Sequence, residues 1–255
     1  MQFCVFRLYA PLSSWGDIAV GMERRSFYQP SKSAIVGLVS AALGIDRSES
    51  DELRNLFDSL GVGIKLINPG DSIIDYHTTQ TVKKEKKVVY RTRRDEMYAN
   101  PDKVNAILSS REYRSDSLSI VALWMNETYE RGYSLEEIRQ ALLSPKYHLY
   151  LGRKSCPPAL PLQPQIVEGD NLKEVLDNTG FGPIIFPLSE DERDIKTANF
   201  VEEQIFRRNK AMFFWESCRN SGFSSWTRRS EKYDRPINRE RWQFGLRYEY
   251  STMED

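Results

Sequence analysis

A dense run of cationic side chains between residues 82 and 114 has the clearest capacity for binding chemistry in this sequence. The run contains ten lysines and arginines against five acids. Such a density of positive charge attracts a polyanion, and an RNA or DNA backbone is the obvious candidate. The alternative is a solvated, charged loop without a partner. The ten cations are Lys83, Lys84, Lys86, Lys87, Arg91, Arg93, Arg94, Lys103, Arg111 and Arg114.

Three consecutive apolar residues, Val88, Val89 and Tyr90, lie inside this basic run. They are too few, and too crowded by charge, to form a strand that is buried in a core. They nevertheless favour extended backbone. A two-stranded ribbon that projects from the body accounts for both properties, and we predict that such a ribbon carries the cations into solvent.

A glycine turn after a predicted strand is a second candidate for anion binding. Gly152 is followed by Arg153, Lys154 and Ser155, and Tyr150 lies just before it. Backbone amides in such a turn can face a phosphate while the two cations supply charge. A simple surface turn explains the same residues equally well.

His77 is a candidate for acid or base catalysis, because it is one of two histidines in the chain and follows Tyr76. Cleavage of RNA without a metal needs a base, an acid and a cation around the scissile phosphate, so that the ribose 2′-OH can attack. The alternatives for His77 are a polar contact with RNA or a buried hydrogen bond. The other histidine, His148, falls in a predicted strand and is expected to be structural.

Further aromatic and cationic residues lie in loops beside the predicted sheet ends. Arg24 and Arg25 can remain solvated, but their position in such a loop favours phosphate binding. Trp15 can stack on a base or pack over the sheet edge, and both interpretations remain open. Trp124, by contrast, ends an apolar strand and is expected in the core.

The composition predicts a globular chain with a sizeable core. Its 255 residues are 40% hydrophobic and 28% charged, which allows one elaborated domain or two small ones. No apolar run approaches the roughly 20 residues that cross a bilayer, and the sequence does not begin like a secretory signal, so we expect a cytoplasmic protein without membrane contact. Cys4, Cys156 and Cys218 are widely spaced and imply neither a disulfide framework nor a zinc site.

The formal net charge is zero, but the charges are segregated along the chain. Residues 168–203 hold ten acids and three bases, whereas residues 207–241 hold ten bases and four acids. This pattern suits an assembly subunit that holds a polyanion on one face and docks basic neighbours on another. The alternative is that the two stretches neutralise each other across the fold.

Hydrophobic periodicity alternates between strand and helix along the first 155 residues. We predict strands over 3–9, 62–67, 73–81, 118–124 and 147–151, and helices that begin at the caps Ser31 or Ser33, Ser50, and Ser134 with Glu137. Pro11 is expected to end the first strand, and Gly44 and Gly61 to end the first two helices. Gly37 inside the first helix costs about 1 kcal/mol relative to alanine, which we attribute to a close approach between helix and sheet.

This order of elements is that of a split βαβ, ferredoxin-like α+β fold with the basic ribbon inserted in its middle connection. We expect one domain at 1–155, with the ribbon at about 82–115, and a β-rich C-terminal extension or small subdomain at 156–255. The fold includes RNA-recognition motifs and RAMP proteins, although many unrelated functions share it. The aromatic platform that is usual in RNA-recognition motifs is missing from the strand at 118–124.

Several of these residues carry a resemblance to a known family. Its specific part is the run Tyr-Leu-Gly-Arg-Lys-Ser-Cys-Pro at residues 150–157. Supporting matches are the first strand with Pro11, Trp15 and Gly16, the helix at 30–44, the motif Asp75, Tyr76, His77 and Thr78, and the tail residues Asp234, Pro236, Arg239, Phe244 and Arg247. Over most of residues 1–160 the sequence resembles the CasD family, the Cas5-type RAMP subunits of type I-E CRISPR Cascade complexes. Ala10 replaces a glycine that is common in the family, and residues 164–230 match no part of it.

The resemblance implies binding without chemistry. CasD proteins hold the 5′ handle of the crRNA at one end of Cascade and project a thumb hairpin against the guide, and the basic run at 82–114 is similar in position to that thumb. The implied partners are crRNA, the backbone CasC-type subunit and the large CasA-type subunit, with target DNA reached only through the complex. The residues expected to bind RNA are Trp15, Arg24, Arg25, Ser31, Lys32, Ser33, His77, Lys83, Lys86, Lys87, Arg91, Arg93, Arg94, Arg111, Tyr150, Gly152, Arg153, Lys154 and Ser155.

Two other functions stay open. A relative in type I-C systems cleaves the crRNA precursor without a metal, and Tyr76, His77 and nearby lysines can be assigned to that chemistry. Because histidine is scarce and the run at 150–157 looks like the type I-E branch, we predict no cleavage. A pure interaction protein would instead use the basic run to bind an acidic subunit. The sequence contains no G-x-x-x-x-G-K-[ST] run, no H-E-x-x-H and no clustered Cys or His, so we expect no cofactor.

Overall fold

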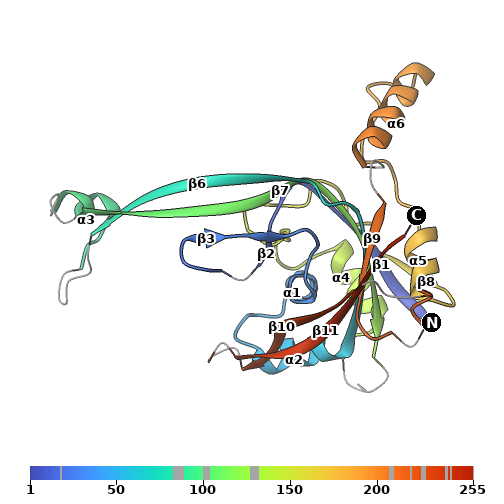
Figure 1. The fold of residues 1–255 in the computed structure, drawn as a ribbon, viewed down its shortest axis with the longest axis horizontal. Helices are drawn as coiled ribbons and strands as arrows, with labels where there is room; N and C mark the ends of the chain where they lie inside the picture. Colours follow the sequence, from blue (N-terminus) through green and yellow to red (C-terminus); the bar gives the residue numbers. More distant parts are fainter. Residues whose placement is uncertain are drawn as a thin grey trace.

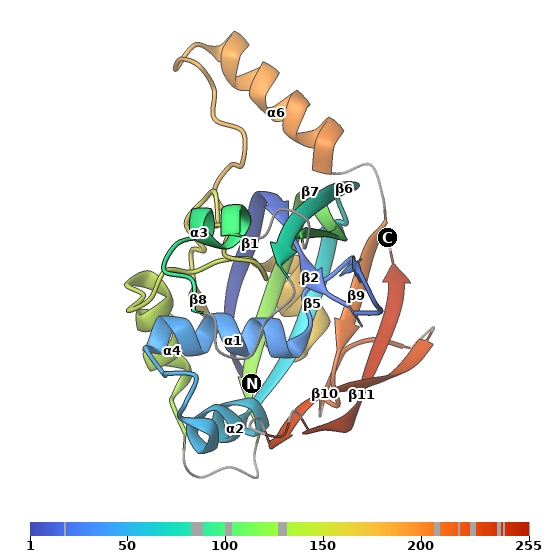
Figure 2. The same ribbon diagram turned by 90° about the vertical axis from the view of Figure 1, so that its left-hand side faces the viewer.

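The computed structural model describes residues 1–17, 19–82, 89–99, 104–126, 132–206, 210–218, 220–224, 228–238, 241 and 243–254, and Figures 1 and 2 show its fold. Within these residues nine strands form one large, mainly antiparallel sheet, in the order β10-β11-β9-β5-β7-β1-β8, with β3 and β6 also paired to β7. These strands are β1 (Gln2–Ser13), β3 (Glu23–Arg24), β5 (Leu60–Asn68), β6 (Asp71–Val82), β7 (Val104–Met125), β8 (Gln165–Glu168), β9 (Ala211–Trp215), β10 (Arg228–Asn238) and β11 (Gln243–Glu254). A separate short pair is formed by β2 (Trp15–Gly16) and β4 (Ser26–Phe27).

Strand β1 has both faces buried. Cys4, Phe6 and Leu8 belong to one hydrophobic cluster, and Phe3 and Val5 belong to a second cluster on the opposite face. A strand that is covered on both sides reads as a nearly continuous apolar run, which is how this segment reads in the sequence. The predicted N-terminal strand is therefore confirmed.

Pro11 does not end β1, contrary to our prediction. Pairing with β7 continues on both sides of the proline, with Ala10 opposite Ser117 and Leu12 opposite Ser115. Proline removes one N–H donor, but its fixed φ is compatible with extended backbone. A strand can therefore pass through proline where that donor is not needed.

Helices cover both faces of the sheet. α1 (Lys32–Leu43), α2 (Ser50–Ser59) and α4 (Leu135–Leu143) pack on the face of Cys4 and Phe6, and α5 (Leu172–Asn178) packs on the face of Phe3. Figure 2 shows α1 lying across the sheet above α2. A further helix, α6 (Glu192–Phe206), projects from the body (Figure 1). Among the described helices, none has the length and apolar character to cross a lipid bilayer.

The predicted ends of α1 and the start of α4 are confirmed. Ser31 Oγ accepts a hydrogen bond from the Ala34 N–H at 3.2 Å, and Gly44 closes α1 in the left-handed region with φ of 80°. Ser134 and Glu137 form a complete capping box at the start of α4. Both devices use residues only three positions apart, so the local sequence is sufficient to specify them.

The capping roles predicted for α2 are wrong, although the helix ends at Ser59, two residues before Gly61, as expected. Glu49 occupies the N-cap position, but its side chain makes no hydrogen bond to the first turn, and Ser50 is the first residue of the helix. Gly61 lies inside β5, where an added Cβ would be 2.0 Å from the ring of Trp124. Gly61 is therefore required for close packing against the buried Trp124 and not for ending a helix.

The predicted strand at 147–151 does not form in the described backbone. The N–H groups of Lys146 and Tyr147 donate to the carbonyls of Ala42 and Ala41, so the chain follows the end of α1 instead of the sheet. The free side of β1 is occupied by β8, where Val5 lies opposite Gln165.

Gly37 does not mark a close approach between α1 and the sheet, contrary to our prediction. An added Cβ at this position would meet no described heavy atom within 4 Å outside its own helical turn.

β6 and the first half of β7 form a long antiparallel ribbon that extends away from the body (Figure 1). Its pairing runs from Asp71 opposite Ser115 to Val82 opposite Val104. The ribbon strands therefore flank most of the basic run, and α3 (Arg93–Ala99) lies near the far end. Residues 73–81 are rich in β-formers, whereas α3 has two acids in its first turn, which favours a helix. Residues 83–88 and 100–103 lie outside the described residues.

Candidate nucleic-acid interface

The glycine turn is attached directly to the end of β1. Gly152 has φ of 85°, and an added Cβ would lie 1.8 Å from the Ser14 carbonyl oxygen. The Ser14 N–H donates to the Leu151 carbonyl at 3.1 Å, and the Cys156 N–H closes the turn on Arg153 O at 2.8 Å. Only glycine satisfies both the left-handed backbone and this close approach.

Arg153 connects the glycine turn to the base of the ribbon. Its guanidinium lies over the ring of Tyr113 in β7, 4.6 Å from the ring centre, and Nη2 donates to the Arg24 carbonyl at 3.1 Å. Its Nη1 atom is buried and has no hydrogen-bond partner among the described residues. The turn, β3 and the ribbon base therefore share one corner of the molecule.

Glu112 holds this corner together from the ribbon side. Its carboxylate accepts hydrogen bonds from the Ser26 N–H at 3.1 Å and from Ser72 Oγ at 2.7 Å, and it pairs with Arg114 at 3.3 Å. Burial acts to raise the pKa of Glu112, but these hydrogen bonds and the positive charge of Arg114 outweigh burial and lower the pKa. Glu112 is therefore a structural anion that joins β4, β6 and β7.

Most of the predicted cations lie on the surface. Arg24, Arg25, Arg91, Arg93, Arg94, Arg111 and Lys154 are exposed, and Arg153 is half-buried. Arg25 pairs with Glu23 and Arg93 with Glu96, whereas the described residues provide no ion pair for Arg91, Arg111 or Lys154. Lys83, Lys86 and Lys87 lie outside the described residues.

Lys32 does not lie at this surface. It is 5% exposed, and its ammonium lies 2.7 Å from the Glu216 carboxylate and 4.5 Å from the ring centre of Phe57. Burial lowers the pKa of Lys32, and the charge of Glu216 opposes this shift. A lysine that is enclosed and paired in this way is a core cation, so its placement does not fit the predicted contact with phosphate.

Trp15 is also enclosed. The side chain is 2% exposed, and the backbone N–H of Trp15 donates to Ser26 Oγ at 2.9 Å. Of the two interpretations of this residue, the structure favours packing.

Ser31 and Ser33 are half-buried, and their hydroxyl oxygens lie 2.9 Å apart at the start of α1. Tyr150 is 44% exposed next to the glycine turn.

His77 lies on the ribbon. Its Nε2 contacts the carboxylate of Asp75, and the His77 side chain is 41% exposed. Asp75 lies opposite Arg111, and His77 lies opposite Ser109, so the ribbon brings a histidine, an acid and an arginine to one place. Tyr76 is 62% exposed.

Two aromatic residues at the base of the ribbon were missed by sequence reasoning. Tyr113 lies beneath Arg153, and Tyr28 is 54% exposed with the guanidinium of Arg114 4.3 Å from its ring centre. Each is a tyrosine within a stretch of arginines, and aromatic residues among cations are the signal that would have indicated them.

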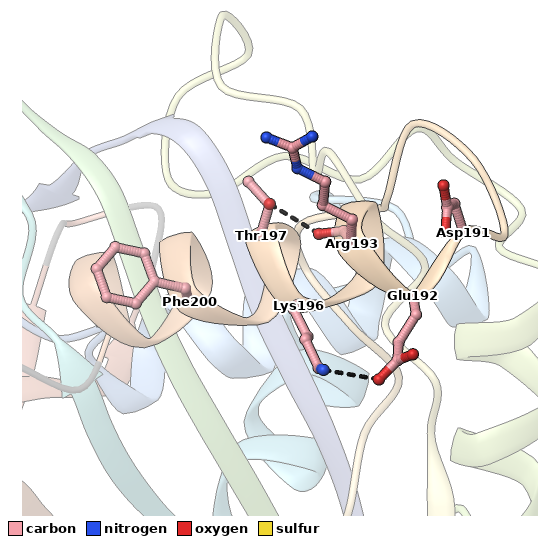
Figure 3. Close-up of a pocket in the computed structure, with 6 residues that line it drawn as sticks. All are labelled: Asp191, Glu192, Arg193, Lys196, Thr197 and Phe200. Carbon is pink, nitrogen blue, oxygen red and sulfur yellow. Dashed lines mark hydrogen bonds and ion pairs between the residues drawn. The ribbon is translucent and has the colours of Figure 1, made fainter.

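A hollow of about 530 Å³ lies along α6, apart from this corner (Figure 3). Its contacts are those of a single helix: Lys196 pairs with Glu192 at 2.6 Å, and Thr197 Oγ1 donates to the Arg193 carbonyl at 2.8 Å. It includes none of the predicted site residues. In the described part of the chain, no group of three or more His, Cys, Asp or Glu is placed to hold a metal ion.

The profile of the family described as CRISPR-associated protein (Cas_Cas5) matches residues 3–249. The chain belongs to the Cas5 family. The match spans the ribbon, the glycine turn and residues 164–230, for which the sequence alone indicated no relationship.

Individual relatives agree with this Cas5 assignment. The CRISPR system Cascade subunit CasD of Escherichia coli (strain K12) is 31% identical over 163 residues, which are 63% of this chain and 69% of that protein. Two solved structures share the fold, one titled "CRISPR RNA-guided surveillance complex" and one titled "Crystal structure of Cas protein". The first has a TM-score of 0.62 at 20% identity and covers 98% of this chain and 89% of that chain. The second has a TM-score of 0.59 at 24% identity and covers 98% and 94%. The resemblance to CasD is thus confirmed.

Proposed function

We propose that this Cas5 protein is a non-catalytic, crRNA-binding subunit of a type I-E Cascade complex that caps the 5′ handle of the crRNA. The observation that carries the proposal is the contact of Arg153 with Tyr113, which puts the glycine turn beside the base of the cationic ribbon. The Nη1 atom of Arg153 is enclosed, so the exposed cations on either side of this contact, Arg111 and Lys154, are the ones that can reach phosphate oxygens.

The binding mechanism follows from the distribution of charge. Arg111 and Lys154 are exposed on the two sides of the corner, where they neutralise phosphates. The N–H groups of residues 153–155 donate to the same backbone, whereas the Gly152 N–H is bonded to the Tyr150 carbonyl at 3.1 Å. Exposed rings, Tyr28 and Tyr150, stack on splayed bases, each stack contributing about 1–3 kcal/mol.

The assembly partners are assigned by relationship. The E. coli relative is named a Cascade subunit, and one similar structure is titled an RNA-guided surveillance complex. The partners in this proposal are crRNA, a CasC-type backbone subunit and a CasA-type large subunit. Target DNA is contacted only through the complex, and the site of action is the cytoplasm.

The finer description of the fold belongs to the same proposal. The order β8-β1-β7-β5, with α1 and α4 on one face, supports a ferredoxin-like core. The projecting β6–β7 ribbon supports the role of a thumb that rests on the guide. The division into units at 1–155 and 156–255 stays a prediction.

The test is recovery of RNA. The full chain is co-expressed with the products of its neighbouring genes and purified, the absorbance ratio at about 260 and 280 nm is measured, and any recovered nucleic acid is sequenced. We expect one class of RNA with a common 5′ end, whose affinity falls steeply as salt rises. Purification of the complex without nucleic acid would contradict the proposal and favour a pure interaction protein.

The second candidate function is cleavage of the crRNA precursor. The observation in its favour is the contact between His77 and Asp75, with Arg111 opposite Asp75, because these groups can act as base, acid and cation. All three lie on the exposed ribbon, where no described element encloses a scissile phosphate, and catalysis of this kind gains most in a site from which water is excluded. Binding without cleavage is therefore the better supported function.

A further inference from the structure

A groove of about 330 Å³ opens between α1, residues 147–150 and the hairpin of β10 and β11. It is continuous with the candidate interface, since Tyr150 lines the groove and precedes the glycine turn by two residues. Figure 2 shows the helices α1 and α2 beside this hairpin, and both helices contact β10. Its lining includes Ser33 and Tyr150, which were predicted to bind RNA, and the tail residues Asp234, Pro236 and Phe244, which contributed to the resemblance.

The lining of the groove divides into two kinds of surface. Its buried part is apolar, and it includes Val36, Leu53 and Phe57. Its exposed part is aromatic, with Tyr147 at 48% exposure, Tyr150 at 44% and Phe244 at 37%. A groove with an apolar floor and exposed aromatic rings at its edge can hold a planar aromatic group by stacking.

Gly37 keeps the groove open. It lies in the middle of α1, where glycine in place of alanine lowers the equilibrium constant for helix formation roughly fivefold. No packing contact explains the glycine, because a Cβ there would meet no described heavy atom within 4 Å beyond its own turn. Gly37 lines the groove, and any larger side chain would project into it.

Charged and polar side chains line part of the groove. Asp46 and Asp234 both line it. The Asp46 carboxylate accepts a hydrogen bond from Ser48 Oγ at 2.6 Å, and hydrogen bonds from Ser48 lower the pKa of Asp46, so it stays ionised. Asp234 pairs with Arg247 at 2.6 Å. Arg47 also lines the groove, so its charges are mixed, and an uncharged base can accept hydrogen bonds from Ser33 or His148.

We propose that this groove accepts one unstacked nucleobase of the RNA that lies along the glycine turn. The inference rests on the proposed function, since it requires RNA at the turn. A volume near 330 Å³ is at the lower end of the range of about 300–1,000 Å³ for small-molecule sites, which suits one planar ring and excludes a protein helix. The base enters through the exposed rings while its phosphates stay outside with Lys154 and Arg153.

The test is a double-mutant cycle between the protein and the RNA. The probe is a synthetic single-stranded RNA with the sequence of the RNA recovered with the protein, and a series of the same RNA with one abasic nucleotide at each position. The protein variants are Gly37→Leu, which fills the groove, and Asn55→Leu, which places leucine on an exposed face of α2 outside it. Dissociation constants are measured for each combination.

We expect one abasic position to weaken binding to the unchanged protein by roughly 5- to 150-fold, the range of a lost base stack. The same abasic RNA should bind Gly37→Leu no more weakly than the intact RNA does. Asn55→Leu should retain the full effect. Gly37→Ala serves as a second, smaller variant, and its thermal melting should occur at or above the temperature of the unchanged protein, since an added Cβ meets no described neighbour. The same measurement checks that Gly37→Leu is folded.

The outcomes separate the two proposals. If RNA binds but no abasic position is coupled to Gly37, the groove proposal is overturned and the proposed function stands. If no RNA binds, both are overturned. If Gly37→Leu leaves every RNA affinity unchanged but prevents association with a co-expressed subunit, the groove receives a protein side chain and the base proposal is wrong.

Discussion

The guanidinium of Arg153 lies 4.6 Å from the centre of the Tyr113 ring, although the two residues are 40 positions apart in the sequence. Arg153 belongs to the glycine turn and Tyr113 to the base of the projecting ribbon. Their contact places two separately predicted anion-binding features on one surface.

The contact itself should contribute measurable stability. A double-mutant cycle of Arg153→Met and Tyr113→Leu should give a coupling free energy of about 0.5–2 kcal/mol in urea unfolding, the range for a partly desolvated cation over a ring. A matched cycle of Arg153→Met with Tyr147→Leu, whose ring belongs to the groove, should give a coupling near zero. Equal coupling in both cycles would mean that the Arg153–Tyr113 contact has no specific effect.

Gly152 should not tolerate a side chain. Alanine at this position would adopt an unfavourable left-handed backbone and overlap the Ser14 carbonyl, so Gly152→Ala should lower the free energy of unfolding by about 2 kcal/mol or more. Gly180→Ala is the control, since Gly180 has neither a positive φ nor a described atom within 4 Å of an added Cβ. Equal melting temperatures for the two variants would argue against the close approach at Gly152.

Neutralising exposed cations at the corner should reduce the salt dependence of RNA binding. For the double substitution Arg111→Gln and Lys154→Gln, the slope of log K against log salt should fall by about 0.7 for each lost phosphate contact to a single strand. The matched control neutralises Arg54 and Arg193, which are exposed on α2 and α6. A control with the same loss of slope would show that net charge, and not this corner, determines binding.

Removal of Lys32 should leave Glu216 as a poorly compensated buried carboxylate. Burial raises the pKa of Glu216, and the charges of Lys32 and Arg247 act to lower it, so Lys32→Met should raise this pKa further. The ionised form then destabilises the fold above the folded-state pKa, and the penalty disappears as the pH falls toward the unfolded value of 4.5.

We therefore expect Lys32→Met to cost about 3 kcal/mol near pH 8 and less near pH 5, measured by urea unfolding at both values. The double variant with Glu216→Gln is the control, because it removes the titrating group and should show the same loss at both pH values. A loss in Lys32→Met that does not change with pH would contradict this account.

We expect neither the unchanged protein nor His77→Ala to cleave RNA. Purified protein incubated with labelled repeat RNA, without metal, is expected to give no defined product at any pH between about 6 and 9, because the His77–Asp75 pair lies exposed on the ribbon. A defined product that is lost in His77→Ala but persists in His148→Ala would establish cleavage and overturn the binding-only function.

The sequence alone determined those features that depend on near neighbours. The caps of α1 and α4 were predictable because each joins residues three positions apart, and β1 was predictable because alternation and apolar content act along one strand. The run at residues 150–157 indicated the family, because the order of eight consecutive residues can be compared without any knowledge of the fold.

Only the tertiary structure decided where distant residues meet. Lys32 reads as a surface cation until Glu216, far along the chain, encloses its ammonium. Gly37 reads as a packing glycine until the β10–β11 hairpin forms the opposite wall of a groove. The described ribbon pairing joins Val82 to Val104 and includes Arg111 and Arg114 of the basic run, because β-forming residues far apart in the sequence pair across β6 and β7. Sequence patterns act over a few residues, whereas burial, pairing and cation–ring contact depend on which surfaces the complete fold brings together.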